Sequence, residues 1–244
     1  MALRSRIAVL SAAIAIGALS AASVLPARWA LRLLPDDGLI TVADADGTFW
    51  HGRAWIALGH PETRRLLPDP VQWQWRGLAI ELSHPWLRGP LTLSPGWNSM
   101  EISAQQAQLP AAALTSLGMP WNTLAPTGKL ELAWHTLSTR QPQAAGPLLD
   151  LTWRDAGSAL SPLAPLGSYR LHLASTGKAL TLDLTTEQGP LALSGQGSWD
   201  AGRWRFQGQA KADANATATQ AAQLAGLLTA IGPLRNGTHP FEVN

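Results

Sequence analysis

The stretch DGTFWHGRAW, Asp46 to Trp55, holds the residues of this sequence whose types and spacing could do chemistry. His51 lies between two tryptophans, so it could belong to a reactive centre, or the two indoles could stack against sugar rings. Two glycines five residues apart are equally typical of a strand whose neighbours lie close to its backbone. The rest of the chain has to distinguish a reactive site from a carbohydrate-binding patch and from a structural element.

The common catalytic motifs are absent from the sequence, which has no G-x-S-x-G elbow, H-E-x-x-H pair, P-loop or dinucleotide fingerprint. The six histidines are scattered, and none has a second metal-ligand residue at helical spacing. His135 and His172 fall on the polar phase of their expected strands, which indicates solvated side chains. Asp183 and Glu187 lie on a polar phase or in a turn, and no spacing nominates a pair of glycosidase carboxylates. We therefore expect a protein that is not an enzyme and that uses no metal or cofactor.

The composition argues against several other classes of function. Only 14% of the residues are charged and the formal net charge is +2, so the isoelectric point near 9.5 does not indicate a nucleic-acid-binding surface. No cluster of Lys and Arg interleaved with aromatic residues occurs, and we predict no nucleic-acid partner. The absence of cysteine excludes disulfides, thiolate metal sites and a cysteine nucleophile, but it is neutral about the cellular compartment.

An uncharged apolar segment follows two arginines at the start of the chain and runs from Ile7 to Ala27. As a helix its 21 residues would measure about 30 Å, which matches the hydrocarbon core of a bilayer. The small residues of Ala18–Ser23 also suit a signal peptidase, so a retained anchor and a cleaved signal both stay open. Trp29 follows the segment, where an indole favours the membrane interface. We predict an anchor or signal over residues 1–29 and an exported β-rich domain over residues 30–244.

From about residue 40 onward, apolar residues alternate with polar ones, which is typical of strands with one buried face. The alternating runs include Val71–Arg76, Leu78–Ser83, Leu130–His135, Leu149–Trp153, Tyr169–Leu173, Leu180–Leu184, Leu191–Leu193 and Trp204–Phe206. Glycine and proline turn residues lie between the runs. Such clean alternation favours antiparallel strands over a parallel sheet covered by helices on both faces.

Few stretches favour helices, and the two candidates are Pro110–Leu117 and Ala216–Ile231. Two helices cannot cover the apolar face of eight or more strands, so the sheet must curl over its own inner face as a groove, half-pipe or sandwich. The fold that we predict is mainly β. An N-terminal transmembrane helix precedes a curved antiparallel sheet, a groove or half-pipe, with one or two short helices.

The aromatic residues are mostly tryptophan: the sequence has twelve tryptophans, one tyrosine and three phenylalanines. Exposed indoles on a curved sheet could stack against sugars. Several tryptophans instead share the phase of Leu, Val or Phe in their own strands, and this phase favours groove lining or core. These residues are Trp73, Trp75, Trp134, Trp153 and Trp204.

The stretch GTFWHGRA at 47–54 follows a single apolar segment and has the pattern GT-(apolar)-W-(any)-G-R-A. Further motifs follow it in order: LPDPVQWQW (67–75), PLGSYRLHL (165–173), LTLDLTTEQGPLALSGQGSW (180–199), RFQGQA (205–210) and AAQLAGLLTAIGPLRNG (221–237). In their order and spacing, these motifs resemble those of the type II secretion system protein N family. The resemblance covers nearly the whole chain.

This resemblance implies a single-pass inner-membrane protein with a periplasmic C-terminal domain, an accessory part of the machine that exports folded proteins across the outer membrane. Its partners would be other secretion components, either the secretin or inner-membrane platform subunits, and the family is not known as enzymatic. A more distant similarity to AsmA-like proteins with curled β-sheet grooves leaves an alternative, in which a groove binds or transfers lipid or another apolar ligand.

The first motif can then be interpreted as architecture rather than as a reactive site. Its family positions, Gly47, Thr48, Trp50, Gly52 and Arg53, would be structural. The two glycines would permit close backbone approach or a positive φ. Trp50 would anchor the first strand against the floor of the groove.

Overall fold

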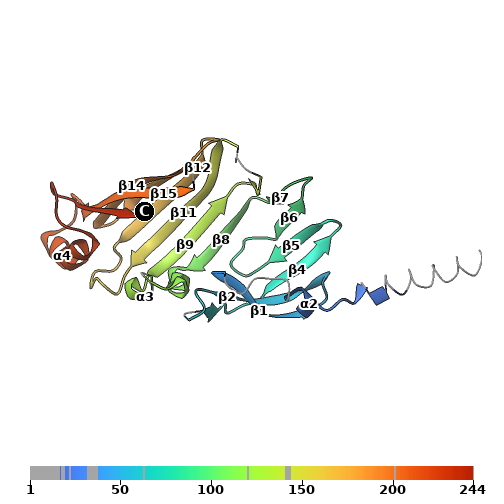
Figure 1. Ribbon diagram of the computed structural model, residues 1–244. Helices are drawn as coiled ribbons and strands as arrows, with labels where there is room; N and C mark the ends of the chain where they lie inside the picture. Colours follow the sequence, from blue (N-terminus) through green and yellow to red (C-terminus); the bar gives the residue numbers. More distant parts are fainter. Residues whose placement is uncertain are drawn as a thin grey trace, which may run out of the picture. The chain divides into compact units, whose positions relative to one another are not determined.

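The computed structural model of the chain describes residues 17, 20, 21, 23–31, 38–62, 64–119, 121–140, 144–200 and 202–243. These residues form antiparallel β-sheets that are not closed, together with a few short helices (Figure 1). The predicted mainly β, antiparallel fold is therefore confirmed. The chain divides into two compact units, unit 1 up to His84 and unit 2 from Pro85 onward, a division that the sequence did not indicate.

Unit 1 consists of antiparallel strands joined in hairpins, in the order β1-β2-β4-β5. The strands are β1 (Ile40–Gly47), β2 (His51–Leu58), β3 (Arg65–Leu66), β4 (Val71–Arg76) and β5 (Ala79–Ser83). The short β3 pairs with the C-terminal end of β2, while β4 pairs with its N-terminal end. In β4, half-buried and exposed residues alternate as the period of two predicts. The helical turn α2 (Ala27–Leu31) packs on β1.

Unit 2 contains an eight-stranded antiparallel sheet in the order β16-β15-β14-β13-β12-β11-β9-β8. The strands are β8 (Gln105–Pro110), β9 (Thr127–Trp134), β11 (Gly146–Gly157), β12 (Gly167–Ser175), β13 (Leu180–Gln188), β14 (Leu191–Asp200), β15 (Arg203–Ala212) and β16 (His239–Val243). Strands adjacent in sequence lie side by side through most of this sheet, which is the arrangement that short turns between alternating runs favour. A smaller antiparallel set in the same unit has the order β6-β7-β10, with β6 (Leu91–Pro95), β7 (Met100–Ile102) and β10 (Leu137–Ser138).

The helices of unit 2 lie in the two longest connections of the eight-stranded sheet. The 3₁₀ helix η1 (Ala111–Leu117) and α3 (Trp121–Leu124) connect β8 to β9, and α4 (Ala218–Ile231) connects β15 to β16 (Figure 1). A capping box starts α4, since the Thr217 hydroxyl accepts the Gln220 N–H at 3.2 Å and the Gln220 side chain accepts the Thr217 N–H at 2.9 Å. Both helices that the sequence predicted are present, although the first is 3₁₀ rather than α.

The predicted membrane segment, Ile7–Ala27, lies for the most part outside the described residues. Among the residues that the structure does describe, no helix is long and apolar enough to cross a membrane. The predicted boundary at residue 29 falls inside α2. Ala27 of this helical turn is buried in a small cluster with Ala45 and Ala54 of β1 and β2, so the turn belongs to unit 1.

Candidate interaction surfaces

The glycines of the first motif close the hairpin between β1 and β2, where Gly47 and Gly52 form the last residue pair. Gly47 has a φ of +95°, in the region that favours glycine. A Cβ atom on Gly52 would lie 2.2 Å from the carbonyl oxygen of Asp46. The N–H of Thr48 donates to the carbonyl of His51 at 2.9 Å and completes the turn. Backbone geometry therefore requires both glycines.

Four aromatic side chains gather at this turn, namely Phe49, Trp50, Trp73 and Trp75. The indole N–H groups of Trp73 and Trp75 both donate to the carbonyl oxygen of Phe49, at 3.0 Å each. The Phe49 ring centroid lies 5.4 Å from those of Trp50 and Trp75. Trp50 itself is 40% exposed and lies in the turn between β1 and β2, and its predicted role as an anchor against a groove floor stays a prediction. Trp73 and Trp75 of β4 hold the turn.

The same turn also holds the segment that ends the N-terminal apolar run. The Phe49 N–H donates to the carbonyl of Leu25 at 2.8 Å. Pro26 forms an isolated antiparallel bridge with Thr48. This contact could not be predicted, because no sequence pattern in either segment indicates that the two meet.

Charged side chains surround the hairpin on its exposed side. Arg28 lies 3.3 Å from Asp46 and 3.8 Å from Asp44. Arg53 lies 3.8 Å from Asp46, and its guanidinium carbon is 5.6 Å from the centre of the Trp55 ring. Each exposed pair adds little stability. Together they balance the two carboxylates with two guanidinium groups.

In unit 2, one face of the eight-stranded sheet is apolar from strand to strand. The register places Leu132 opposite Leu151, Leu151 opposite Leu171, and Leu171 opposite Leu184. Because side chains alternate between faces, these leucines project to the same side of the sheet. All four are half-buried rather than buried. We call this surface, centred on the four leucines, the apolar face.

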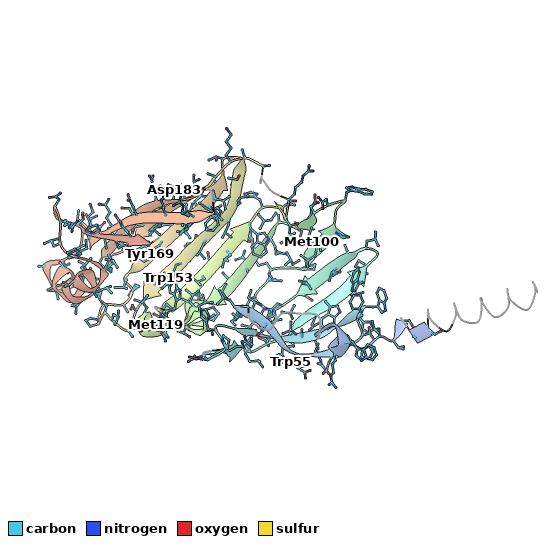
Figure 2. All side chains as sticks on the ribbon, in the orientation of Figure 1. Trp55, Met100, Met119, Trp153, Tyr169 and Asp183 are labelled. Atoms are coloured by element: carbon cyan, nitrogen blue, oxygen red, sulfur yellow. The ribbon has the colours of Figure 1, made fainter. Side chains whose placement is uncertain are left out.

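The tryptophans predicted for groove lining or core in unit 2 lie on the apolar face and are half-buried: Trp134, Trp153 and Trp204. The Trp134 indole N–H donates to the carbonyl of Ser103 at 3.0 Å. The Trp153 indole N–H donates to the carbonyl of Thr127 at 2.8 Å. Trp153 also packs edge-on against Tyr169 of the neighbouring strand, with ring centroids 6.2 Å apart (Figure 2). The indole N–H groups of Trp134 and Trp153 are therefore satisfied by backbone, which leaves their rings on the face.

Helix α4 covers only one end of the apolar face. Its Leu224, Leu227 and Leu228 are buried in a cluster of sheet and helix residues. The other buried members are Leu166, Leu191 and Ala210, and the partly buried neighbours are Leu163, Leu193, Ala212, Ile231 and Phe241. As the structure describes this cluster, it includes none of the three tryptophans and none of the four central leucines. The middle of the apolar face therefore lies outside the core that α4 completes.

The opposite face of the same sheet is polar and carries ion pairs between strands. Arg154 lies 2.7 Å from Glu131, and Arg170 pairs with Glu187. The hydrogen bond from Arg154 is the main cause that holds the pKa of Glu131 below its usual value. The same bond raises the pKa of Arg154. These pairs link neighbouring strands across a solvated surface.

Two further features of unit 2 could have chemical meaning. His172 Nδ1 lies 2.8 Å from Asp150 on the polar face, and Asp183 stands opposite His172 on the next strand (Figure 2). An open depression of about 570 Å³ lies over β13 to β16 and is lined mostly by Gln, Thr, Ser and acidic residues. Within the part of the chain that the structure describes, no group of three His, Cys, Asp or Glu side chains could hold a metal ion.

The single tyrosine joins the sheet to the cluster below α4. The Tyr169 hydroxyl donates to the carbonyl of Leu191 at 3.0 Å. Burial raises the pKa of Tyr169 well above its usual value, so the hydroxyl stays protonated and remains a donor. The sequence indicated only the strand phase of Tyr169 and not this bond, because its partner is a backbone atom 22 residues away.

The chain was compared with protein-family models, with curated proteins and with solved structures. Searches of curated proteins and of solved structures found no significant match. The family model described as type II secretion system (T2SS), protein N matches residues 39–242, which include both units from just before β1 into β16. Because this match spans far more than half of the sequence, the chain belongs to the type II secretion system protein N family.

Proposed function

We propose that this protein is an accessory, non-catalytic component of the type II secretion system that acts through protein–protein contacts in the periplasm. Residues 1–29 would hold it in the inner membrane as a single-pass anchor, with the rest of the chain on the periplasmic side. The observation that carries the proposal is the family match over residues 39–242. The apolar run at Ile7–Ala27 supports the anchoring.

The open sheet edge at β16 suits such contacts. This strand ends the order of the eight-stranded sheet and pairs with β15 on its inner side. An edge strand can accept a strand of a partner, with backbone hydrogen bonds supplying affinity. The partners that we propose are the outer-membrane secretin or a subunit of the inner-membrane platform.

A cross-linking experiment tests this role in cells. A photoreactive residue in place of Glu242, exposed on β16, should capture a secretion component, while the same residue in place of Lys178, exposed between β12 and β13, serves as the control. Deletion of the gene should leave secreted substrates in the periplasm. Normal export of every substrate after deletion would exclude the proposed role.

A second candidate function is the binding or transfer of lipid or another apolar ligand. The observation that favours it is the apolar face, since α4 covers one end and Leu151 and Leu171 are only half-buried. An acyl chain on this face would remove apolar area from water at about 25 cal/mol per Å².

Native mass spectrometry of the protein transferred into detergent-free solution tests this second function. Bound lipid should be present in the wild type and reduced in Leu171→Gln. The neighbouring substitution Arg170→Gln, on the polar face, is the matched control and should leave the bound lipid unchanged. Repeated absence of lipid from the wild type would exclude a carrier role.

A further inference from the structure

Large apolar side chains are exposed at one end of the unit 1 sheet, where β1 turns into β2 and β4 turns into β5. Trp50 lies in the first turn and is 40% exposed, and Leu78 lies in the second and is 78% exposed. The two turns are neighbours, since His51 pairs with Gln74 and the Trp75 N–H donates to the carbonyl of Trp50 at 2.8 Å.

Val24, the third exposed residue, lies at the same end and is 66% exposed. The chain there runs antiparallel to the first turn, because Pro26 bridges Thr48 and Leu25 accepts the Phe49 N–H. Val24 is one residue further along in the direction of Trp50. We call Val24, Trp50 and Leu78 the turn-end patch.

The turn-end patch rests on the aromatic cluster of Phe49 and Trp75. The ring of Trp50 lies 5.8 Å from that of Trp75 and 5.4 Å from that of Phe49. Two indole hydrogen bonds to the Phe49 carbonyl fix the backbone below it. A patch supported in this way costs little side-chain entropy when a partner covers it.

The path of the chain indicates what covers the patch. The uncharged run Ile7–Ala27 has the length of a bilayer-spanning helix, and its last residues are held at the patch by Thr48 and Phe49. A span that ends here brings the patch to the bilayer surface. Trp29 lies one helical turn after Pro26 and is 63% exposed. Indoles favour the headgroup layer of a bilayer. Arg28 offsets the carboxylates of Asp44 and Asp46, which an anionic surface would otherwise repel.

We propose that the turn-end patch is seated in the interfacial layer of the bilayer, so that unit 1 is fixed against the membrane and not suspended from a free linker. This inference rests on the anchoring part of the proposed function. Phospholipid is the occupant: Trp50 and Leu78 enter the boundary between headgroups and acyl chains, and the Phe49–Trp75 cluster lies behind them.

The cysteine-free chain allows a direct test with single-cysteine variants of the full-length protein. Leu78→Cys and Leu66→Cys are a matched pair, because both leucines are strongly exposed in unit 1, at 78% and 56%. Leu66 pairs with Ala57, six residues along β2 from His51, which places it about 20 Å from the patch end. Each variant is labelled with an environment-sensitive fluorophore and reconstituted in vesicles of phosphatidylethanolamine and phosphatidylglycerol, with or without nitroxide-bearing lipid.

The label at position 78 should show blue-shifted emission and lose intensity when nitroxide lipid is present, and iodide in the water should quench it weakly. The label at position 66 should be quenched by iodide and not by the lipid. If both labels respond only to iodide while the protein floats with the vesicles, the inference is wrong and the anchor stands. A label at 78 that neither quencher reaches indicates a protein contact and also overturns it. Failure to float overturns the anchor and the inference together, whereas the secretion role is judged separately by the export assay.

Discussion

Gly52 faces the carbonyl oxygen of Asp46 and the ring of Trp73, and neither contact leaves space for a side-chain carbon. We expect Gly52→Ala to lower the free energy of unfolding by about 2–3 kcal/mol, since a backbone oxygen has to move. Gly77→Ala is the control, because Gly77 has a φ of +64° but nothing within 4 Å of its would-be Cβ. Strain alone should cost about 1 kcal/mol there. Urea denaturation followed by tryptophan fluorescence measures both, and equal losses would contradict the role of close approach.

Glu131 gives a residue-level prediction about pH. Its pKa is lowered chiefly by the hydrogen bond from Arg154, so the charged form is favoured in the folded protein. A lowered folded-state pKa contributes stability above the unfolded value, about 4.3, and this contribution is lost as the pH falls through the folded value. Glu131→Gln should therefore be less stable than wild type at pH 7, and the difference should shrink in acid. Urea midpoints across this pH range test it. Glu101→Gln, at an exposed position of β7, is the control, and a constant difference for Glu131→Gln would contradict the linkage.

At the scale of elements, α4 is the helix that gives the eight-stranded sheet a buried cluster. Its capping box, Thr217 followed three residues later by Gln220, is formed by residues that are close in sequence. Its buried side, with Leu224 at the centre, depends on Leu191 and Ala210 of two separate strands. Helix propensity and period therefore predict α4, but not the part of the sheet that it covers.

We expect Leu224→Ala to cost about 2–5 kcal/mol of unfolding free energy, because the side chain is fully buried and its removal leaves a cavity in the cluster. Leu234→Ala is the matched control, since the same atoms are removed from a strongly exposed side chain just beyond α4. It should change stability by less than about 0.5 kcal/mol. Thermal or urea unfolding measures both variants. A small loss for Leu224→Ala would mean that α4 does not hold the sheet.

At the scale of the whole molecule, each unit has its own buried cluster. Ala27, Ala45 and Ala54 form that of unit 1, while the leucines of α4 form that of unit 2. Substitutions in two clusters that share no residue should act independently.

The double variant Gly52→Ala/Leu224→Ala tests this independence. Its loss of unfolding free energy should equal the sum of the two single losses within about 0.5 kcal/mol. Denaturation curves of the four proteins in the cycle provide the measurement. A coupling well above that value would show that the two substitutions do not act independently.

The order of motifs and the period of two allowed the family and the antiparallel β fold to be predicted, because alternation is a local property of the chain. Both helical segments were predicted for the same reason. The curling of the sheet into a groove or half-pipe and the domain spanning 30–244 stay predictions. The phase of Trp50 indicated a strand, but Trp50 lies in the turn that the pair Gly47 and Gly52 closes, because the glycines let the chain reverse there.

By itself, the sequence determined the antiparallel β class, the two main helical segments, the alternating faces and the resemblance to the secretion protein family, all of which follow from neighbours along the chain. Only the tertiary structure decided that the Phe49 N–H bonds the carbonyl of Leu25, that Trp73 and Trp75 share one carbonyl acceptor, and that the central leucines lie outside the cluster of α4 and stay half-buried. The physical reason is range: such contacts join backbone and side-chain atoms far apart in sequence, and no local pattern specifies which ones meet.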